Sequence, residues 1–308
     1  MHMGIENCTL CPRRCGARPG FCGADDALEV ASVCVHRGEE PPLNPIVNIF
    51  FAHCNLQCVY CQNWQISGKG ERLKVIGERY TVDTIADKVC QQLSSFSSKS
   101  STPLIGLVTA AHYADRIPEL IEAIRARGFS PAVVYNSGGY ESVETLRSLE
   151  GYVDIYLPDF KYMDSRIAAL YSHAPDYPEV AQAAIEEMIR QVGLGLKTDA
   201  DGVAYRGIIV RHLVLPGHID NTLAVLERLA AISSQHSTLN PIHLSLMAQY
   251  YPPRPGLPAP LNRSLTPEEY AVAVARAEEL GLTNGWIQEL EAKQNYRPDF
   301  SRQNPFEQ

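Results

Sequence analysis

Short apolar runs that alternate with amphipathic segments constrain the fold of this 308-residue chain more than any other feature of its sequence. Six runs are typical of buried strands, and segments of helical periodicity separate most of them. The expected strands span residues 46–52, 104–108, 132–135, 152–157, 207–213 and 242–246. Strands and helices in alternation favour parallel β/α units with right-handed crossovers. The pattern therefore predicts an α/β fold built on a largely parallel sheet.

The expected helices carry apolar residues on one face. Thr81 can cap the clearest of them, whose apolar stripe comprises Val82, Ile85, Ala86, Val89, Cys90, Leu93 and Phe96. Further helices are expected over residues 118–127, 141–149, 164–171, 178–192, 221–232 and 267–280. An additional strand is expected over residues 27–35, and Asp201-Gly202 marks a turn before the strand at 207–213.

The same pattern divides the chain into three parts. A cysteine-rich lead-in covers residues 1–44, the strand and helix series covers 45–250, and an extension over 251–308 is expected to pack on the series. Six strands are too few to close a standard eight-stranded barrel. Ligands of parallel β/α folds gather at the carboxyl ends of the strands, so the functional residues are expected there.

Composition excludes several classes of protein. Hydrophobic residues at 45% and charged residues at 20% are typical of a soluble globular chain. No apolar run approaches the ~20 residues that span a bilayer, and the N-terminus lacks the pattern of a secretory signal. The net charge of -8 disfavours broad electrostatic binding to nucleic acid. Nine cysteines without an export signal favour a reducing compartment, so we expect a cytoplasmic protein without membrane contact.

A C-x3-C-x2-C run follows the first predicted strand and comprises Cys54, Cys58 and Cys61. Soft thiolates suit an iron-sulfur cluster, and a short loop can wrap one cubane. Three ligands for four irons leave one iron open to a small molecule, which separates a reactive centre from a structural one. The alternatives are a zinc site short of one ligand and three core cysteines that are close by coincidence.

Residues 8–23 hold a second cysteine group, which we call the knuckle and which carries the thiols of Cys8, Cys11, Cys15 and Cys22. A segment this short has no apolar core of its own and generally needs a metal to fold. The number of ligands fits structural zinc and an auxiliary iron-sulfur cluster equally well. Unliganded or redox-active thiols are the third alternative.

Polar residues collect where the predicted strands end. They are Thr109, His112, Asn136, Ser137, Asp159, Lys161, Arg211 and His212. Arginine and lysine can hold a carboxylate there, whereas capping and salt bridges at the rim are the alternative. His36, Glu39 and Glu40 precede the first strand of the series and form either the mouth of a site or a surface turn.

The Cys54 to Cys61 run, with the aromatic Tyr60 before its third cysteine, resembles the signature of the radical S-adenosylmethionine (radical SAM) superfamily. The resemblance implies a partial (β/α)6 TIM-type barrel whose open side admits a large substrate. It also implies a [4Fe-4S] cluster whose open iron binds S-adenosylmethionine, with Tyr60 against the adenine. Electron transfer from a partner such as flavodoxin or ferredoxin would lead to a 5'-deoxyadenosyl radical that abstracts hydrogen.

An ordered set of motifs resembles the branch related to pyruvate formate-lyase activating enzyme, and within it the PflX-like proteins. The motifs are the knuckle, His36-x-Gly-Glu-Glu-Pro41, Cys61-Gln62-Asn63, Asn136-Ser-Gly-Gly-Tyr140, Asp159-x-Lys161 and Arg211-His-Leu-Val-Leu-Pro216. The resemblance implies that Asp159 and Lys161 support the methionine carboxylate. It also implies that Asn63, Thr109, Asn136, Ser137 and Arg211 complete the S-adenosylmethionine site. Thr109 to His112 take the place of the glycine-rich run that many members of the superfamily carry after their second strand.

Three functions remain open at this level. The radical would either activate a partner glycyl radical enzyme or modify a small metabolite or peptide. A non-catalytic electron-transfer protein is the third reading, and the open iron argues against it. His112 and His212 are candidates for substrate contact or proton transfer, with structural roles as their alternative.

Overall fold

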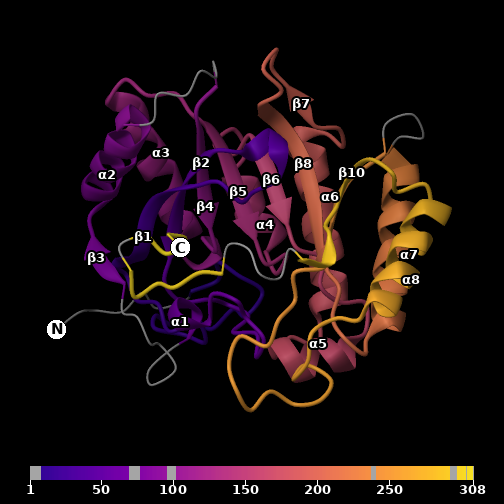
Figure 1. The fold of residues 1–308 in the computed structure, drawn as a ribbon. Coiled ribbons are helices and arrows are strands. Elements are labelled where there is room, and N and C mark those ends of the chain that lie inside the picture. The colour runs from indigo at the N-terminus through magenta and orange to yellow at the C-terminus, as the bar shows by residue number, and fades with distance from the viewer. Residues whose placement is uncertain are drawn as a thin grey trace.

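The computed structural model describes residues 8–68, 77–95, 102–236, 241–291, 297–302 and 304–307. Its strands form one ten-stranded sheet (Figure 1). The strands are β1 (Leu28–His36), β2 (Ile46–Phe51), β3 (Glu78–Tyr80), β4 (Leu104–Val108), β5 (Ala132–Ser137), β6 (Ile155–Pro158), β7 (Lys197–Thr198), β8 (Ala204–Leu213), β9 (His243–Met247) and β10 (Gly285–Ile287).

The order along the sheet is β10-β9-β8-β6-β5-β4-β2-β1-β3, and β7 pairs with β8 beside this path. All neighbours from β2 to β10 are parallel, whereas β1, β3 and β7 pair antiparallel. The predicted strands are therefore confirmed, as β2, β4, β5, β6, β8 and β9, together with the α/β class and the mostly parallel sheet. β10 was not predicted, because its three residues are too few to show an alternation.

Helices cover the sheet and connect its strands. They are α1 (Trp64–Ser67), α2 (Val82–Ser95), α3 (Ile117–Ala126), α4 (Val143–Ser148), α5 (Ser165–Ser172), α6 (Tyr177–Val192), α7 (Ile219–His236) and α8 (Pro267–Glu279), with 3-10 turns η1 (Pro41–Leu43) and η3 (Ala111–Arg116). Figure 1 shows α2 and α3 at one end of the sheet and α7 and α8 at the other. Among the described helices, none is both long and apolar enough to cross a membrane.

α2 forms as its apolar stripe predicts. Six of the predicted stripe residues are buried, and the seventh, Phe96, lies outside the described residues. The Thr81 side-chain oxygen accepts a hydrogen bond from the backbone N–H of Thr84 at 3.2 Å, which satisfies a donor of the first turn. The buried face contacts α3, β1 and β2, so α2 packs directly against the strand that precedes Cys54.

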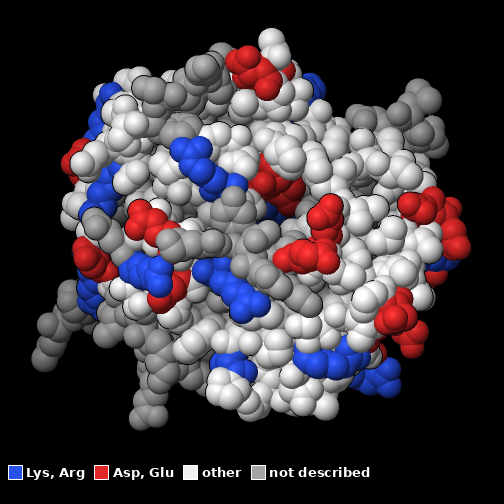
Figure 2. All heavy atoms as spheres, in the orientation of Figure 1, with Lys and Arg blue, Asp and Glu red and all other residues white. Residues whose placement is uncertain are grey.

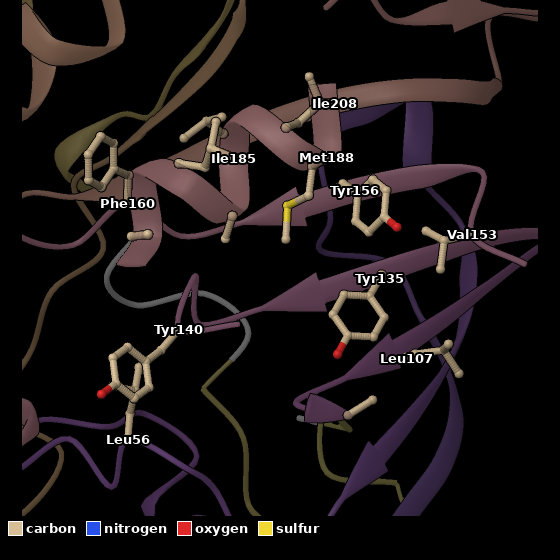
Figure 3. Close-up of a cluster of buried hydrophobic side chains, with 14 of the residues drawn as sticks. Leu56, Leu107, Tyr135, Tyr140, Val153, Tyr156, Phe160, Ile185, Met188 and Ile208 are labelled. Carbon is tan, nitrogen blue, oxygen red and sulfur yellow. The ribbon is translucent and has the colours of Figure 1, made fainter. Parts of the chain in front are cut away.

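α6 packs against the centre of the sheet. Figure 3 shows Met188 directed from this helix toward the ring of Tyr156 on β6. Ile185 and Met188 are fully buried, and the burial of each such side chain stabilises the fold by roughly 1.5–3 kcal/mol. This contact fixes β6, whose carboxyl end leads directly to Asp159.

Described segments near both termini contact the first parallel strand, β2, or the loop that follows it. The knuckle packs against the loop after β2, where the Gln57 side chain donates a hydrogen bond to the carbonyl of Phe21 at 2.7 Å. Near the C-terminus, Phe300 and Phe306 lie against Phe50 of β2, with ring centroids 5.4 and 5.5 Å apart. Figure 1 accordingly shows the last described segment of the chain near β1.

Candidate functional site

A cavity of about 460 Å³ lies where the parallel strands end. Its walls include the last residues of β4, β5, β8 and β9 and the loops that follow β2 and β6. This is the position at which parallel β/α folds bind ligands. On the face that Figure 2 shows, acidic and basic side chains are interspersed around a central hollow.

The loop after β2 brings three cysteines to this cavity. Cys54, Cys58 and Cys61 all line it, and none of the three is fully exposed. His53 and Gln57 both have a positive φ, at 72° and 52°, which gives the loop its tight course. Such a conformation is costly for residues with a side chain and persists only where surrounding contacts hold it.

Burial raises the pKa of all three thiols. The pKa of Cys54 rises to about 12 and that of Cys61 to about 11, through burial first and then through the neighbouring thiols. Burial also raises the pKa of Cys58, against which the Lys161 charge and a hydrogen bond from Ser172 act. Three half-buried thiols with raised pKa values need a positively charged partner to exist as thiolates, and this donor set fits an iron-sulfur cluster.

The residues expected to contact S-adenosylmethionine come together at the cysteines. Every one of them lines the cavity: Tyr60, Asn63, Thr109, Asn136, Ser137, Asp159, Lys161 and Arg211. They come from the loop that carries Cys54, Cys58 and Cys61 and from the ends of four strands. The structure thus collects residues that are spread over more than 150 positions of the sequence.

Thr109 has a strained backbone. Its φ is +61°, a left-handed conformation that is an outlier for a β-branched residue. The conformation is held by a hydrogen bond from the Thr109 N–H to the carbonyl of Asn136 at 3.0 Å. Strain of this kind gathers at functional sites, where the surrounding structure compensates for it.

Asp159 and Lys161 form an ion pair inside the cavity. The phenol of Tyr177 accepts from the Lys161 N–H at 3.0 Å and donates to the Asp159 carbonyl at 2.8 Å, so the backbone of this turn is fixed. Gly139 allows the neighbouring loop to approach, because a Cβ there would lie 2.1 Å from the Asp159 carbonyl oxygen. The Lys161 ammonium is therefore presented to the cavity from a rigid turn.

Ser137 is already engaged by another residue. Its hydroxyl donates to the buried carboxylate of Glu141 at 2.6 Å and accepts from the Gly139 N–H at 2.9 Å. Burial raises the pKa of Glu141 to about 7, against the hydrogen bonds from Ser137 and Tyr135. Ser137 thus retains only acceptor capacity toward a ligand while Glu141 is ionised.

Arg211 pairs with two glutamates on the opposite wall. Its guanidinium donates to Glu40 at 2.8 Å and 2.5 Å and also contacts Glu39. Burial alone would raise the pKa of Glu39, but the Arg211 charge and His36 outweigh it and hold that pKa well below its usual range. The side chains of His36, Glu39 and Glu40 are at most 9% exposed and all three residues line the cavity, so this segment is a wall of the site rather than a surface turn.

His112 and His212 do not line the cavity. The His112 Nε2 atom lies 2.8 Å from the carbonyl of Ala52, and burial lowers the pKa of His112 to about 3. His212 contacts the Phe160 carbonyl through Nδ1 at 2.7 Å and the Thr222 hydroxyl through Nε2 at 3.0 Å. Burial lowers the pKa of His212 to about 4, so both rings are neutral near pH 7.

The knuckle lies next to the cysteine loop. Its thiols range from buried Cys11 to exposed Cys15, with Cys8 and Cys22 half-buried. Burial raises the pKa of Cys22, and the nearby thiols of Cys8 and Cys15 raise it further. In the described part of the chain, no three His, Cys, Asp or Glu side chains are arranged to hold a single metal ion.

Several cavity residues gave no signal in the sequence. Tyr251, Trp286 and Phe306 come from the C-terminal extension and line the cavity beside β9 and β2. Trp286 belongs to β10, whose pairing with β9 carries it there. The sequence could not identify these three residues as part of a site, because an aromatic residue in a terminal extension is equally typical of packing in the core.

Comparisons with known proteins give distant relatives. No protein-family profile matches the chain. The uncharacterized protein MJ0674 of Methanocaldococcus jannaschii is 29% identical over 289 residues, which cover 90% of this chain and 76% of that protein. The uncharacterized protein MJ0808 of the same organism is 23% identical, covering 85% of this chain and 78% of that protein.

One solved structure, described as native anSMEcpe with bound AdoMet, resembles the chain with a TM-score of 0.45 and 11% identity. The match covers 75% of this chain, which spans 60% of the length of that structure.

Proposed function

We propose that this chain is a radical SAM enzyme, with its sheet as the partial barrel and its active site in the cavity at the strand ends. One observation carries the proposal: the three cysteines and all eight expected S-adenosylmethionine contacts line the same cavity. Its volume of about 460 Å³ lies within the ordinary range for cofactor and small-ligand sites.

The cysteines would hold a [4Fe-4S] cluster through Cys54, Cys58 and Cys61. When bound, such a cluster supplies the electron that cleaves S-adenosylmethionine to methionine and a 5'-deoxyadenosyl radical, which abstracts hydrogen from a substrate. Three protein thiolates leave one iron for the ligand, as in other metal centres with an open position. An electron donor such as flavodoxin or ferredoxin would complete the system.

The chain's own residues bind and orient the ligand. The Lys161 charge acts on Cys58 and Cys61, and its pairing with Asp159 leaves ammonium protons for a methionine carboxylate. Tyr60 presents a ring to the cavity and Asn136 an amide, which suit an adenine and a ribose. Arg211, which Glu39 and Glu40 hold in place, would complete the S-adenosylmethionine site.

Apolar residues form part of the same wall. Phe50, Val108 and Leu213 line the cavity, and Phe306, which also lines it, lies against His36 with ring centroids 4.1 Å apart. A reactive radical needs a site from which solvent is removed, because side reactions compete with hydrogen abstraction.

The first test is reductive cleavage of S-adenosylmethionine by protein that is reconstituted anaerobically with iron and sulfide. We expect 5'-deoxyadenosine with dithionite, and none from a variant in which Cys54, Cys58 and Cys61 are all alanine. Cys90→Ala is the matched control, because Cys90 is a buried cysteine of α2 outside the cavity. A fully loaded, reducible cluster that produces no 5'-deoxyadenosine would favour the electron-transfer reading.

The target of the radical separates two versions of the enzyme. An activase should generate a glycyl radical, visible by electron paramagnetic resonance, on a partner glycyl radical enzyme. An enzyme that acts on a small metabolite or peptide should transfer deuterium from labelled substrate into 5'-deoxyadenosine. A glycyl radical signal supports the first version, and deuterium transfer without one supports the second.

The knuckle would carry a second metal site at Cys8, Cys11, Cys15 and Cys22, either zinc or an auxiliary cluster. Its support is four thiols in one short segment that touches the cysteine loop. Metal and sulfide analysis of the variant without Cys54, Cys58 and Cys61 isolates this site. Residual zinc, residual iron with sulfide, or no metal at all would each identify one of the three alternatives.

A further inference from the structure

A chain of buried hydroxyl groups ends on one of the three cavity cysteines. The Ser172 hydroxyl lies 2.9 Å from the Cys58 sulfur, and the Tyr162 hydroxyl lies 2.7 Å from that of Ser172. Tyr60 continues the chain with its own hydroxyl against that of Tyr162. Ser172 and Tyr162 are completely buried and Tyr60 is 4% exposed, so bulk water does not reach these side chains directly.

The number of protons fixes the direction of the chain when Cys58 is a thiolate. A thiolate has no proton, so the Ser172 hydroxyl must donate to it. Ser172 has then used its single proton, and the Tyr162 hydroxyl must donate to Ser172. By the same count Tyr60 donates to Tyr162. Phenols have an ordinary pKa of about 10, so both keep their protons near neutral pH.

Backbone contacts hold Ser172 in place independently of its hydroxyl. The Val59 N–H donates to the carbonyl of Tyr171 at 2.8 Å, which joins the last turn of α5 to the cysteine loop. The Arg13 guanidinium donates to the Ser172 carbonyl at 3.1 Å from the other side. Removal of the hydroxyl alone therefore leaves the backbone beside Cys58 where it is.

We propose that Ser172 is a positioning residue that raises the reduction potential of a cluster bound at Cys58, through a hydrogen bond oriented by Tyr162 and Tyr60. This inference rests on the cluster of the proposed function. A reduced cluster carries more negative charge on its sulfurs than an oxidised one. A donor to a ligating sulfur therefore stabilises the reduced form more, and hydrogen bonds to sulfur are among the factors that set cluster potentials. Donors in series polarise one another, so Tyr162 strengthens the effect of Ser172.

The test is a redox titration of the reconstituted protein, followed by the electron paramagnetic resonance signal of the reduced cluster. Ser172→Ala should lower the midpoint potential relative to the unmodified chain. Tyr162→Phe keeps the ring and removes the second donor, so it should lower the potential by a smaller amount. Ser148→Ala is the matched control, because Ser148 is an exposed residue whose hydroxyl donates to the Thr145 carbonyl on α4. The midpoint potential of the cluster in this variant should not change.

The outcomes separate this inference from the proposed function. A Ser172→Ala variant with unchanged iron content and unchanged potential would overturn the role of Ser172 and leave the enzyme assignment intact. Failure of the unmodified chain to hold any cluster would overturn both. Equal shifts in Ser172→Ala and Ser148→Ala would show a general effect of the substitution and would also contradict the inference.

Discussion

Arg13 of the knuckle donates a hydrogen bond to the main-chain carbonyl of Asn55 at 2.9 Å, within the cysteine loop. The same guanidinium reaches the carbonyls of Ser172 and His173 at the end of α5. Its planar group also lies over the rings of Phe21 and Tyr140, at 4.0 and 5.0 Å from their centroids. One side chain thereby joins the knuckle, the cysteine loop and α5.

We expect Arg13→Ala to loosen the cysteine loop. Hydrogen bonds from a charged donor contribute about 1.5–3 kcal/mol each when partly buried, and three carbonyl acceptors lose their partner here. The variant should retain less iron after reconstitution and should show faster proteolysis near Cys54. Arg14→Ala is the control, because Arg14 is exposed and has only a 3.8 Å contact with exposed Glu144. Equal iron retention in both variants would contradict this role of Arg13.

We expect Gly106→Ala to destabilise the sheet beneath the cavity. Asn48 on β2 lies opposite Gly106 on β4, and a Cβ at position 106 would lie 1.9 Å from the Asn48 Oδ1 atom. Overpacking in a close-packed interior costs roughly 1–3 kcal/mol. A double-mutant cycle with Asn48→Ala checks the cause by urea unfolding, because Gly106→Ala should cost much less once the Asn48 side chain is absent. If the losses of stability from Gly106→Ala and Asn48→Ala simply add in the double variant, the new Cβ does not clash with the Asn48 side chain.

Local patterns predicted the scaffold of this site. The six parallel strands, the stripe of α2 and the position of Cys54 after a strand all depend on residues within one short window. Because parallel strands end at one edge of a sheet, the sequence also predicted that Asn136, Asp159 and Arg211 would lie close together. The cavity contains all three.

Local sequence patterns could not predict contacts between residues that are far apart in the sequence. Nothing in the sequence shows that Arg211 pairs with Glu39 and Glu40, about 170 positions earlier, so those glutamates read equally well as a turn. The contact between Ser172 and Cys58 likewise depends on how the end of α5 packs against the cysteine loop, 114 positions earlier in the sequence. A histidine after a strand likewise gives no sign of its partner, and His212 proves to be held by a main-chain carbonyl and a threonine.

The buried pairs of Arg211 predict a pH-dependent stability. The pKa of Glu39 is depressed in the folded protein, so its contribution is fully present above the unfolded value of about 4.5 and decreases as the pH falls toward the folded pKa. Glu39→Gln should therefore unfold more easily than the unmodified chain at pH 7, with a difference that narrows below pH 4.5. Urea unfolding at pH 7 and below pH 4.5 measures this difference in the free energy of unfolding. A difference that does not change with pH would contradict the ion-pair explanation.

Arg211→Met should lower the free energy of unfolding more than Glu39→Gln does. It leaves two buried carboxylates without their cation, and the loss of one partner from a buried pair costs about 3–5 kcal/mol. The triple variant Arg211→Met, Glu39→Gln and Glu40→Gln should recover much of that loss, because it removes the unpaired charges as well. A triple variant no more stable than Arg211→Met in urea unfolding at pH 7 would show that packing, not charge, dominates.

The hydrogen bonds of Glu269, a residue that does not line the cavity, predict a second pH-dependent contribution to stability. Its carboxylate accepts from both terminal nitrogens of Arg263 at 2.7 Å, from the Thr266 N–H at 3.0 Å and from the Gly217 N–H at 2.6 Å. These hydrogen bonds, that from Arg263 foremost, lower the pKa of Glu269 to about 2. The stabilisation is therefore complete above about pH 4.5 and is lost as the pH falls toward 2.

Glu269→Gln should accordingly lower the melting temperature at pH 7 and have a smaller effect near pH 3. The capping box with Thr266 alone contributes about 1 kcal/mol, and the Gly217 contact extends the effect to the loop after β8. Glu268→Gln is the matched control, since Glu268 is an exposed residue of the same first helical turn. If both substitutions lower the melting temperature equally at pH 7, the helix dipole rather than the cap accounts for the loss, because both glutamates lie in the first turn and only Glu269 caps the helix.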